Sequence, residues 1–529
     1  MQDKKYFGVM INLSSAVMKV EKVKEFALII KKLGYNMIQL YTEDTYEVNN
    51  EEYFGYLRGG YSKNDLKDIV NYCNDIGIEV IPCVEVLAHL STIFKWQDYA
   101  VINDTDDILL TEEKRTYTLI DNIFATLREC FTSNRVNIGL DEAHNLGLGN
   151  YLKKHGYQDK SEIFFKHINV VSEIASKYGF RPMMWSDLLF KNIYGSYYNA
   201  KNDGQIAKQK DKLPKNIDLV YWEYFFYKPN QYEDMLKLHK DYGKEVWFAG
   251  AVHNYIGASP SNDMSDLSLL AGITACKNQE IDNILITLWG GPECSHFLTL
   301  PSLCYASCIR DGITDLKEIQ KRFFDATGEN YDYIRALDAP NTLADSFLNL
   351  PEIDFCRYVL FQDIFSGYFD TILKEGACRK YYEKAIEFET LKKGSAYEYL
   401  FNLQIALLKA MYFKHDLGIK LRRAYQNKDL DALRILHGDI LKTIDAVKEF
   451  HKASTVMWKK ENNPHGMEIN DIKIGGLIAR LVSCADTLQE YLDGKTDTIL
   501  ELETKLKPFK ATGQNYLFWS KIVTVNRFD

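Results

Sequence analysis

Eight short apolar runs alternate with longer amphipathic segments through the first 310 of the 529 residues. The runs are rich in β-branched and aromatic side chains, as strands are, and the segments between them have helical periodicity. Eight strands that alternate with helices predict an α/β fold, a closed TIM (β/α)8 barrel with its active site at the carboxyl ends of the strands. The expected strands are Tyr6–Asn12, Met37–Tyr41, Glu79–Val84, Arg135–Leu140, Phe180–Trp185, Asp218–Trp222, Glu245–Ala249 and Asn283–Trp289.

Helical patterns lie between these strands, and two of them begin near serines that can cap a helix, Ser62 and Ser161. The structural alternative is a doubly wound open sheet. Such a sheet normally carries a glycine-rich phosphate turn after a strand, and the sequence has none, so the barrel is favoured. The helices are expected at Glu21–Leu33, Lys63–Ile76, Tyr117–Phe131, Ser161–Tyr178 and Asp263–Lys277.

The character of the sequence changes after about Asp315, where strand-like runs largely vanish and long helical patterns follow. We therefore expect two domains, a catalytic barrel over residues 1–315 and an all-helical C-terminal domain over residues 316–529. The helical domain is expected either to support the barrel or to form the interface of a homodimer. Its longest helices are predicted at Asp354–Leu373, Tyr397–Tyr425, Leu430–Lys460 and Ile472–Leu492.

Charge and composition exclude several classes of partner. A net charge of −9 without a block of lysine or arginine argues against nucleic acid and anionic membrane, and favours a neutral, sugar-like ligand. No apolar run is long enough to cross a bilayer, and no export signal is recognisable at the N-terminus. The ten cysteines are scattered without CxxC pairs, as expected of reduced thiols in the cytoplasm.

Two adjacent carboxylates, Asp141 and Glu142, end the fourth predicted strand. Where the strand breaks into a loop, both can turn to the same side, and close carboxylates push their pKa values apart, so that one can hold a proton for a leaving group. The alternative without a function is an acidic pair at the N-terminus of a helix that faces solvent. The run Asp141–His144 also matches a helicase box, but no phosphate-binding GxxxxGK[ST] loop accompanies it.

Three of the seven tryptophans, Trp185, Trp222 and Trp289, end predicted strands and would face the same end of the barrel. Aromatic faces stack on the apolar C–H faces of sugar rings. Core packing would be the default for one tryptophan, but three at matching positions favour a sugar site. Other polar residues follow strand ends, and each alone is more typical of a supporting role: Glu43, Asp44, Glu85, His89, Asp187, His253, Asn254 and Glu293.

These residues resemble glycoside hydrolase family 20, the β-N-acetylhexosaminidases, over about residues 1–310. The similarity is strongest at Asp141-Glu142, and an intracellular bacterial branch with a long helical C-terminal region resembles nearly the whole chain. Supporting strings are Tyr41–Tyr46, Tyr53–Tyr61, Ala88–Leu90 with Lys95-Trp96, and Trp185–Asp187.

The resemblance implies retaining hydrolysis in which the acetamido oxygen of the substrate attacks the anomeric carbon. Glu142 would be the general acid/base, and Asp141 would orient the acetamido N–H. No metal or organic cofactor is implied. The remaining residues implied in substrate binding are Trp185, Trp222, Trp289, His89, Asp44 and Asp187, with Tyr224 on the acetamido oxygen and Tyr221 and Tyr227 as competitors.

Two departures from the family pattern concern sugar hydroxyls. The first strand of the family usually ends in Asp-x-Ser-Arg, whereas this chain has Asn12-Leu13-Ser14-Ser15 and no arginine. The carboxylate expected two residues beyond Trp289 is replaced by Gly291. Arg58 and Glu293 are the candidates to substitute, and we expect specificity shifted towards N-acetylgalactosamine.

The sequence is also compatible with two other functions. One is a sugar-binding barrel without catalysis, against which the intact Asp141-Glu142 pair argues. The other is a barrel glycosidase with two separated carboxylates, which would cleave sugars that lack an acetamido group.

Overall fold

The computed structural model describes residues 5–343, 355–510 and 518–527. The chain divides into two compact units, each described by itself below. The first comprises Met1–Val252, Ser265–Trp289 and Ser302–Thr327, and the second comprises His253–Met264, Gly290–Pro301 and Gly328–Asp529.

Eight parallel strands of the first unit close into a barrel, which confirms the predicted TIM barrel. Their order around the barrel is β1-β10-β9-β8-β7-β6-β3-β2. Nearly every strand residue is buried, as expected where helices cover the outside of a parallel sheet. The strands are β1 (Phe7–Asn12), β2 (Met37–Tyr41), β3 (Glu79–Cys83), β6 (Arg135–Asn137), β7 (Arg181–Trp185), β8 (Asp218–Trp222), β9 (Val246–Ala251) and β10 (Asn283–Leu288).

The fourth barrel strand, β6, is shorter than predicted and ends at Asn137 rather than at Leu140. Gly139 and Leu140 have φ of 69° and 73°, a left-handed conformation that cannot continue a strand. The backbone therefore turns out of the sheet just before Asp141.

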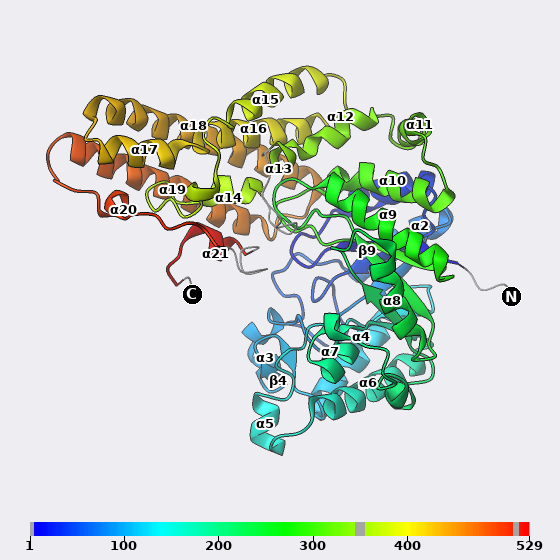
Figure 1. Ribbon diagram of the computed structural model, residues 1–529. Helices are drawn as coiled ribbons and strands as arrows, with labels where there is room; N and C mark the ends of the chain where they lie inside the picture. Colours follow the sequence, from blue (N-terminus) through cyan, green and yellow to red (C-terminus); the bar gives the residue numbers. More distant parts are fainter. Residues whose placement is uncertain (1–4, 344–354, 511–517, 528–529) are drawn as a thin grey trace. The chain divides into compact units, whose positions relative to one another are not determined.

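Helices follow most strands, at the positions the periodicity predicts (Figure 1). Ser62 caps α2 as expected, with a capping box to Asp65. The prediction of Ser161 as a cap is wrong, because Asp159 accepts the Ser161 and Glu162 N–H groups and begins the helix two residues earlier. The longer helices are α1 (Val20–Lys32), α2 (Lys63–Asp75), α4 (Lys114–Cys130), α6 (Lys160–Lys177), α8 (Pro229–Lys240), α9 (Asn262–Asn278), α10 (Leu300–Asp311) and α11 (Leu316–Thr327).

Short elements interrupt several of the connections between the longer helices and strands. The loop after β3 contains a 3-10 turn and a two-stranded hairpin, which the sequence patterns did not predict. These elements are η1 (Ile93–Lys95), α3 (Gln97–Ala100), β4 (Asn103–Thr105), β5 (Ile108–Leu109), α5 (Asn150–His155), α7 (Asp187–Tyr194), η2 (Tyr197–Asn199), η3 (Ala207–Lys212) and η4 (His296–Thr299).

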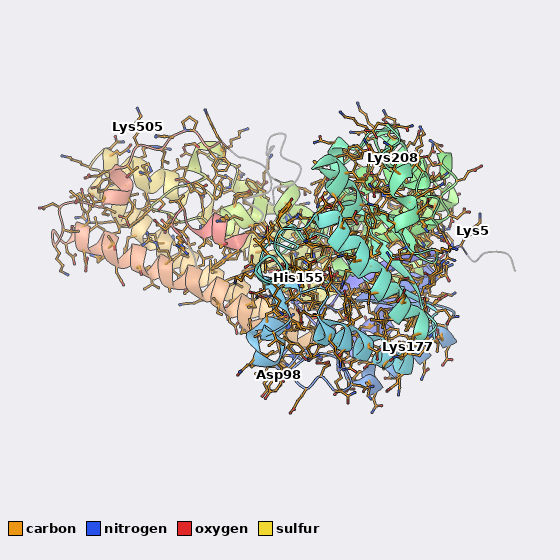
Figure 2. The ribbon with its side chains drawn as sticks, turned by 90° about the horizontal axis from the view of Figure 1, so that it is seen from below. Lys5, Asp98, His155, Lys177, Lys208 and Lys505 are labelled. Atoms are coloured by element: carbon orange, nitrogen blue, oxygen red, sulfur yellow. The ribbon has the colours of Figure 1, made fainter. Side chains whose placement is uncertain are left out.

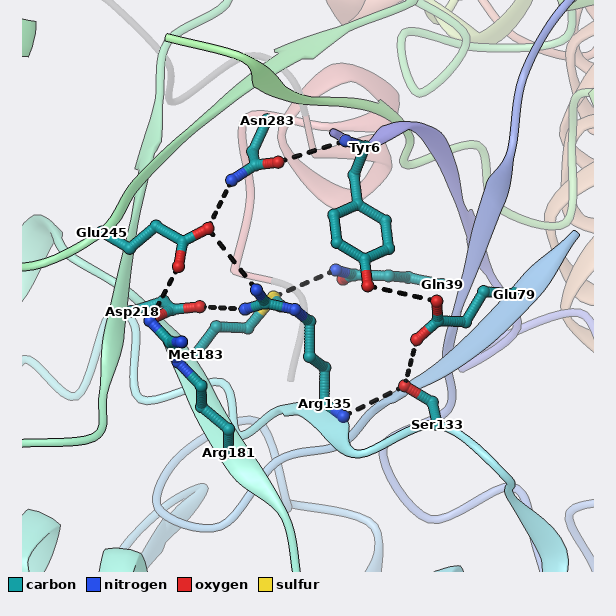
Figure 3. A network of polar contacts seen from close by, with 10 residues as sticks. All are labelled: Tyr6, Gln39, Glu79, Ser133, Arg135, Arg181, Met183, Asp218, Glu245 and Asn283. Carbon is teal, nitrogen blue, oxygen red and sulfur yellow. Dashed lines mark hydrogen bonds and ion pairs between the residues drawn. The ribbon is translucent and has the colours of Figure 1, made fainter. Parts of the chain in front are cut away.

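A network of charged and polar side chains closes the amino-terminal end of the barrel (Figure 3). At its centre, Asp218 is fully buried and accepts hydrogen bonds from Arg181 Nε at 2.9 Å and from Arg135. Glu245 accepts from Arg181 at 2.7 Å and from Asn283 at 2.6 Å. Because strands from around the barrel contribute to it, the network fixes their ends in one register.

The second unit is helical in the described residues, as predicted for the C-terminal region. Within it, α16 packs against α15 and α18, and α18 packs against α17 and α19 (Figure 1). Its helices are α12 (Tyr331–Arg335), η5 (Ala336–Asp338), α13 (Ala339–Thr342), α14 (Phe355–Phe361), η6 (Asp370–Ile372), α15 (Arg379–Leu391), α16 (Glu398–Lys414), α17 (Leu417–Gln426), α18 (Leu430–Glu461), α19 (Met467–Leu492), α20 (Leu500–Glu503) and α21 (Trp519–Val523).

Two predicted helices of this unit are wrong in length. The segment expected as one helix from 354 to 373 contains the short α14 and the 3-10 turn η6, because Asp363 accepts the Phe365 and Ser366 N–H groups in a turn between them. Position 354 lies outside the described residues. The segment Tyr397–Tyr425 is two helices, interrupted where the carboxylate of Asp416 accepts the Gly376 N–H.

None of the helices in the described ranges is long and apolar enough to cross a bilayer. All ten cysteines are free thiols, and nine of them are buried. Charged side chains such as Lys177 and Lys208 lie at the surface (Figure 2).

Replacement of Asp218 by alanine tests the barrel-floor network. The change leaves two guanidinium groups without their buried carboxylate, and we expect the free energy of unfolding to fall by about 3–5 kcal/mol. Asp234→Ala, at an exposed carboxylate in α8, is the matched control and should change it by less than about 0.5 kcal/mol. Equal effects of the two variants in urea unfolding would contradict the role of the network.

Candidate active site

The two carboxylates that follow β6 face one histidine. His89 Nε2 lies 3.5 Å from Asp141 Oδ2 and 4.0 Å from Glu142 Oε2. Strict strand alternation would separate neighbouring side chains, but the left-handed turn at Gly139 and Leu140 brings both carboxylates to the same side. The structure therefore places Asp141, Glu142 and His89 together.

Asp141 and Glu142 differ in exposure. The Asp141 side chain is 13% exposed and the Glu142 side chain 45%. Partial burial and the charge of Asp141 raise the pKa of Glu142 above its ordinary value, and His89 partly opposes them. Glu142 can thus keep a proton to higher pH while remaining reachable by a substrate.

His89 is held as a cation. Burial alone would lower its pKa, but the charge and hydrogen bonding of Asp141, with Glu85 and Glu43 nearby, raise it to about 11. Its backbone N–H donates to Asp107 Oδ2 at 3.1 Å.

Backbone strain is concentrated around these groups. Glu43, His89, Leu140 and Glu142 all have φ between 46° and 73°, a region that non-glycine residues rarely adopt. A left-handed conformation at a non-glycine residue costs on the order of 1 kcal/mol of folding free energy. Such residues cluster at functional sites, where the surrounding structure holds them in place.

Two further carboxyl groups lie close to His89 and carry raised pKa values. Burial raises the pKa of Glu43 to about 7, although His89 and Arg58 lower it, and Tyr41 Oη donates to its Oε1 at 3.2 Å. Burial, followed by the charge of Asp141, raises the pKa of Glu85 well above its ordinary value.

The three predicted tryptophans converge. The Trp185 and Trp289 ring centroids are 6.0 Å apart, and both belong to or pack on the barrel core. Trp289 Nε1 donates to Tyr224 Oη at 2.9 Å, and the Trp222 and Tyr224 rings are 5.4 Å apart. Of its competitors, Tyr221 is buried against His239, and Tyr227 is 38% exposed.

Asp187 connects the aromatic residues to the carboxylate pair. It accepts hydrogen bonds from Trp222 Nε1 at 3.4 Å and from the backbone N–H of Glu142 at 3.5 Å, and it pairs with Lys191 at 2.8 Å. Burial raises its pKa, and Lys191 partly opposes that shift.

Arg58 reaches the segment after β1. Its guanidinium pairs with Asp44 at 3.1 Å and donates to the carbonyl oxygen of Ser14. A cation from the loop after β2 thus lies beside the strand end where the family usually carries an arginine.

Glu293, His253 and Asn254 belong to the second unit. Glu293 pairs with Arg357 at 3.1 Å and with Lys473 at 2.6 Å. Although burial opposes ionisation, these two cations lower its pKa to about 2. Glu293 is therefore a fixed, doubly paired carboxylate. Asn254 Oδ1 accepts the Gly290 N–H at 2.9 Å.

Two residues of this site were not among the predicted ones. Tyr41 contacts Trp289 at 4.9 Å between ring centroids, and Lys191 pairs with Asp187. Tyr41 is the last residue of β2, and Lys191 stands four residues after Asp187 on α7, so strand-end position and helical spacing could have identified both.

No group of three or more metal-binding side chains occurs in the described part of the chain. An acid with a raised pKa beside a second carboxylate, together with a wall of aromatic rings, can cleave a bond to a sugar oxygen by general acid chemistry. The barrel and this site thus define a class, the barrel glycoside hydrolases.

Comparisons with known families agree with that class. Residues 26–224 match the model of the glycosyl hydrolase family 20 catalytic domain, and residues 332–518 match that of the Glycoside Hydrolase 20C C-terminal domain. The chain belongs to glycoside hydrolase family 20.

Curated relatives include Hexosaminidase D of Homo sapiens, 22% identical over 41% of this chain, and that of Bos taurus, 23% identical over 41%. The matches span 44% and 62% of the length of those proteins. One similar solved structure is an exo β-N-acetylglucosaminidase of Vibrio harveyi, with 15% sequence identity and a TM-score of 0.47 over 61% of this chain and 58% of that one. Another is a chitobiase of Flavobacterium johnsoniae, with 16% sequence identity and a TM-score of 0.47 over 94% of this chain and 74% of that one.

The raised pKa of Glu43 predicts a pH-dependent stability. Between about pH 4.5 and 7 the unfolded chain releases this proton while the folded chain keeps it, so the fold loses stability as the pH rises. Glu43→Gln removes the titration. The free energy of unfolding of the variant relative to that of the parent should therefore rise by roughly 3 kcal/mol between pH 4.5 and 8.

Glu47→Gln, at an exposed glutamate of the same loop, is the control. A difference for Glu43→Gln that stays flat with pH in urea unfolding would show that Glu43 is not held protonated.

Proposed function

We propose that this protein is an exo-β-N-acetylhexosaminidase, which removes terminal β-linked N-acetylglucosamine or N-acetylgalactosamine with retention of configuration. The observation that carries the proposal is the pair Asp141-Glu142, turned to one side of β6 with a protonatable, partly exposed Glu142. The substrate is a neutral glycan or aminosugar glycoside, in keeping with the net charge of −9.

In the first step, Glu142 donates its proton to the glycosidic oxygen. The carbonyl oxygen of the 2-acetamido group attacks C1 as the bond to the leaving group breaks, and an oxazolinium ion forms. In the second step, Glu142 takes a proton from the water that attacks C1, which opens the ring and restores the acetamido group. Two inversions at C1 give retention.

Asp141 is proposed to accept the acetamido N–H and to stabilise the positive charge that develops on the ring. Its low exposure strengthens this interaction, because charges attract more strongly away from water. The His89 cation lies 3.5 Å from Asp141 Oδ2 and can hold this carboxylate in place.

We assign the acetamido methyl and the sugar face to Trp185, Trp222 and Trp289, and the acetamido oxygen to Tyr224. The hydrogen bond from Trp289 orients the Tyr224 hydroxyl, and that from Trp222 ties the wall to Asp187. Aromatic walls of this kind bind a sugar through its C–H groups.

Arg58 is proposed to bind sugar hydroxyls O3 and O4 in place of the absent first-strand arginine. Its contact with the Ser14 carbonyl supports this assignment, whereas Glu293 already balances Arg357 and Lys473. Because the usual carboxylate after Trp289 is also replaced, by Gly291, we propose a specificity shifted towards N-acetylgalactosamine.

Glu142→Gln and Asp141→Asn test the acid chemistry. Each should lower kcat/KM for a p-nitrophenyl β-N-acetylhexosaminide by at least about 10²-fold, because each removes a group that acts in the transition state. Glu162→Gln, at an exposed carboxylate paired with Lys212, should leave turnover within about twofold. Activity retained in both site variants would indicate another glycosidase mechanism, and absence of activity in the parent chain would leave a sugar-binding protein.

Turnover of p-nitrophenyl β-GlcNAc and β-GalNAc tests the specificity. We expect comparable rates or faster GalNAc turnover, and Arg58→Ala should lower kcat/KM for both by roughly 10- to 150-fold, the equivalent of about 1.5–3 kcal/mol for a charged hydrogen bond. Arg379→Ala, at an exposed arginine, is the control. A strong GlcNAc preference in the parent chain would refute the shift.

A further inference from the structure

Three aromatic rings contact one another at the surface, outside the cluster around Trp185. The ring centroids of Tyr53 and Tyr56 are 5.6 Å apart, those of Tyr53 and Trp96 are 5.7 Å apart, and those of Tyr56 and Trp96 are 5.1 Å apart. Tyr56 is 47% exposed and the adjacent Leu57 65%. We call these four residues the aromatic ledge.

The ledge lies at the same end of the barrel as the candidate active site. Tyr53, Tyr56 and Leu57 come from the loop after β2, and Trp96 comes from the loop after β3, so both loops leave carboxyl ends of barrel strands. Asp141 and Glu142 follow the carboxyl end of β6, the strand that pairs with β3.

Charged contacts connect the ledge to the carboxylate pair. Arg58 directly follows Leu57 and lies close enough to Glu43 to lower its pKa, as does His89. His89 in turn lies 4.0 Å from Glu142. The loop that carries most of the ledge thus also contributes Arg58, which pairs with Asp44 at 3.1 Å, to the charged groups around the carboxylate pair.

The loop that carries the ledge is tightly held. Tyr61 N–H donates to the Thr45 carbonyl at 3.0 Å, which closes the loop at its base. Gly55 has φ of 69°, and a Cβ there would come within 2.0 Å of the Asp44 carbonyl oxygen. Beneath the exposed rings, Phe54 is buried 5.5 Å from Tyr46, centroid to centroid. The rings are thus presented by a rigid base.

On this basis we propose that the aromatic ledge binds a second sugar ring of the glycan, next to the terminal residue that is cleaved. The proposal rests on the glycosidase function proposed above. Exposed rings held in place suit the apolar C–H faces of pyranoses, and the tyrosine hydroxyls suit their edges. The exposed carboxylates Glu52 and Asp98, the latter labelled in Figure 2, balance the charges of Lys95 and Arg58, so the ledge has no positive excess for a nucleic-acid ligand.

The test compares two substrates of the same β-N-acetylhexosamine. One is its glycosyl fluoride, whose leaving group is a single atom, and the other is its β-linked disaccharide, whose second ring can reach the ledge. Trp96→Ala should lower the ratio of kcat/KM for the disaccharide to that for the fluoride by about tenfold, and Trp96→Phe, which keeps a ring, should restore most of it. Tyr157→Ala, at a tyrosine 77% exposed outside the ledge, should leave the ratio within about twofold.

A ratio that Trp96→Ala leaves unchanged would overturn the proposal, as would an equal loss on both substrates, which indicates a structural effect of the substitution. If the parent chain turns over neither substrate, the glycosidase function fails instead. In that case the affinity for the corresponding trisaccharide, measured by calorimetry, tests the ledge. A dissociation constant at least about tenfold higher in Trp96→Ala than in the parent supports the proposal, and equal dissociation constants overturn it.

Discussion

The electrostatic contact of the His89 cation with Asp141 and Glu142 is the interaction on which the site depends. Two neighbouring carboxylates at close range make it costly to ionise both, and a nearby cation offsets part of that cost. His89 Nε2 lies 3.5 Å from Asp141 and 4.0 Å from the more exposed Glu142, whose pKa is raised by burial and by the charge of Asp141. His89 limits that rise while holding both carboxyl groups on one side of the strand end.

The barrel stabilises the fold at one end of its strands and carries the candidate active site at the other. At its amino-terminal end, Asp218 and Glu245 pair with Arg135 and Arg181 and fix the strands. At its carboxyl end, strained backbone at residues such as His89 and Glu142 costs free energy, which the packed interior and the polar floor offset. Stability and chemistry thus come from opposite ends of the same strands.

Much of this arrangement could be predicted from the sequence because it depends on local patterns. Short apolar runs rich in β-branched and aromatic residues located the eight strands, and strand ends located Asp141, Glu142 and the three tryptophans. The raised pKa values of Glu43 and Glu85 could not be predicted, because they depend on burial and on charges brought in from other strands.

Ion pairs between residues distant in the sequence, and the ends of some helices, could not be predicted either. Glu293 is matched by Arg357 and Lys473, 64 and 180 residues further along the chain, and no spacing rule connects them. The turn at Asp363 forms because its side chain accepts the N–H groups of Phe365 and Ser366, which helical periodicity does not register.

The central claim is that the acetamido group of the substrate, oriented by Asp141, is the nucleophile. Inhibition by a thiazoline that mimics the cyclised intermediate tests it most directly. The account predicts competitive inhibition at least about 10²-fold tighter than that by the monosaccharide product, and loss of most of that difference in Asp141→Asn. A thiazoline that binds no better than the product, together with hydrolysis of sugars that lack the acetamido group, would contradict it.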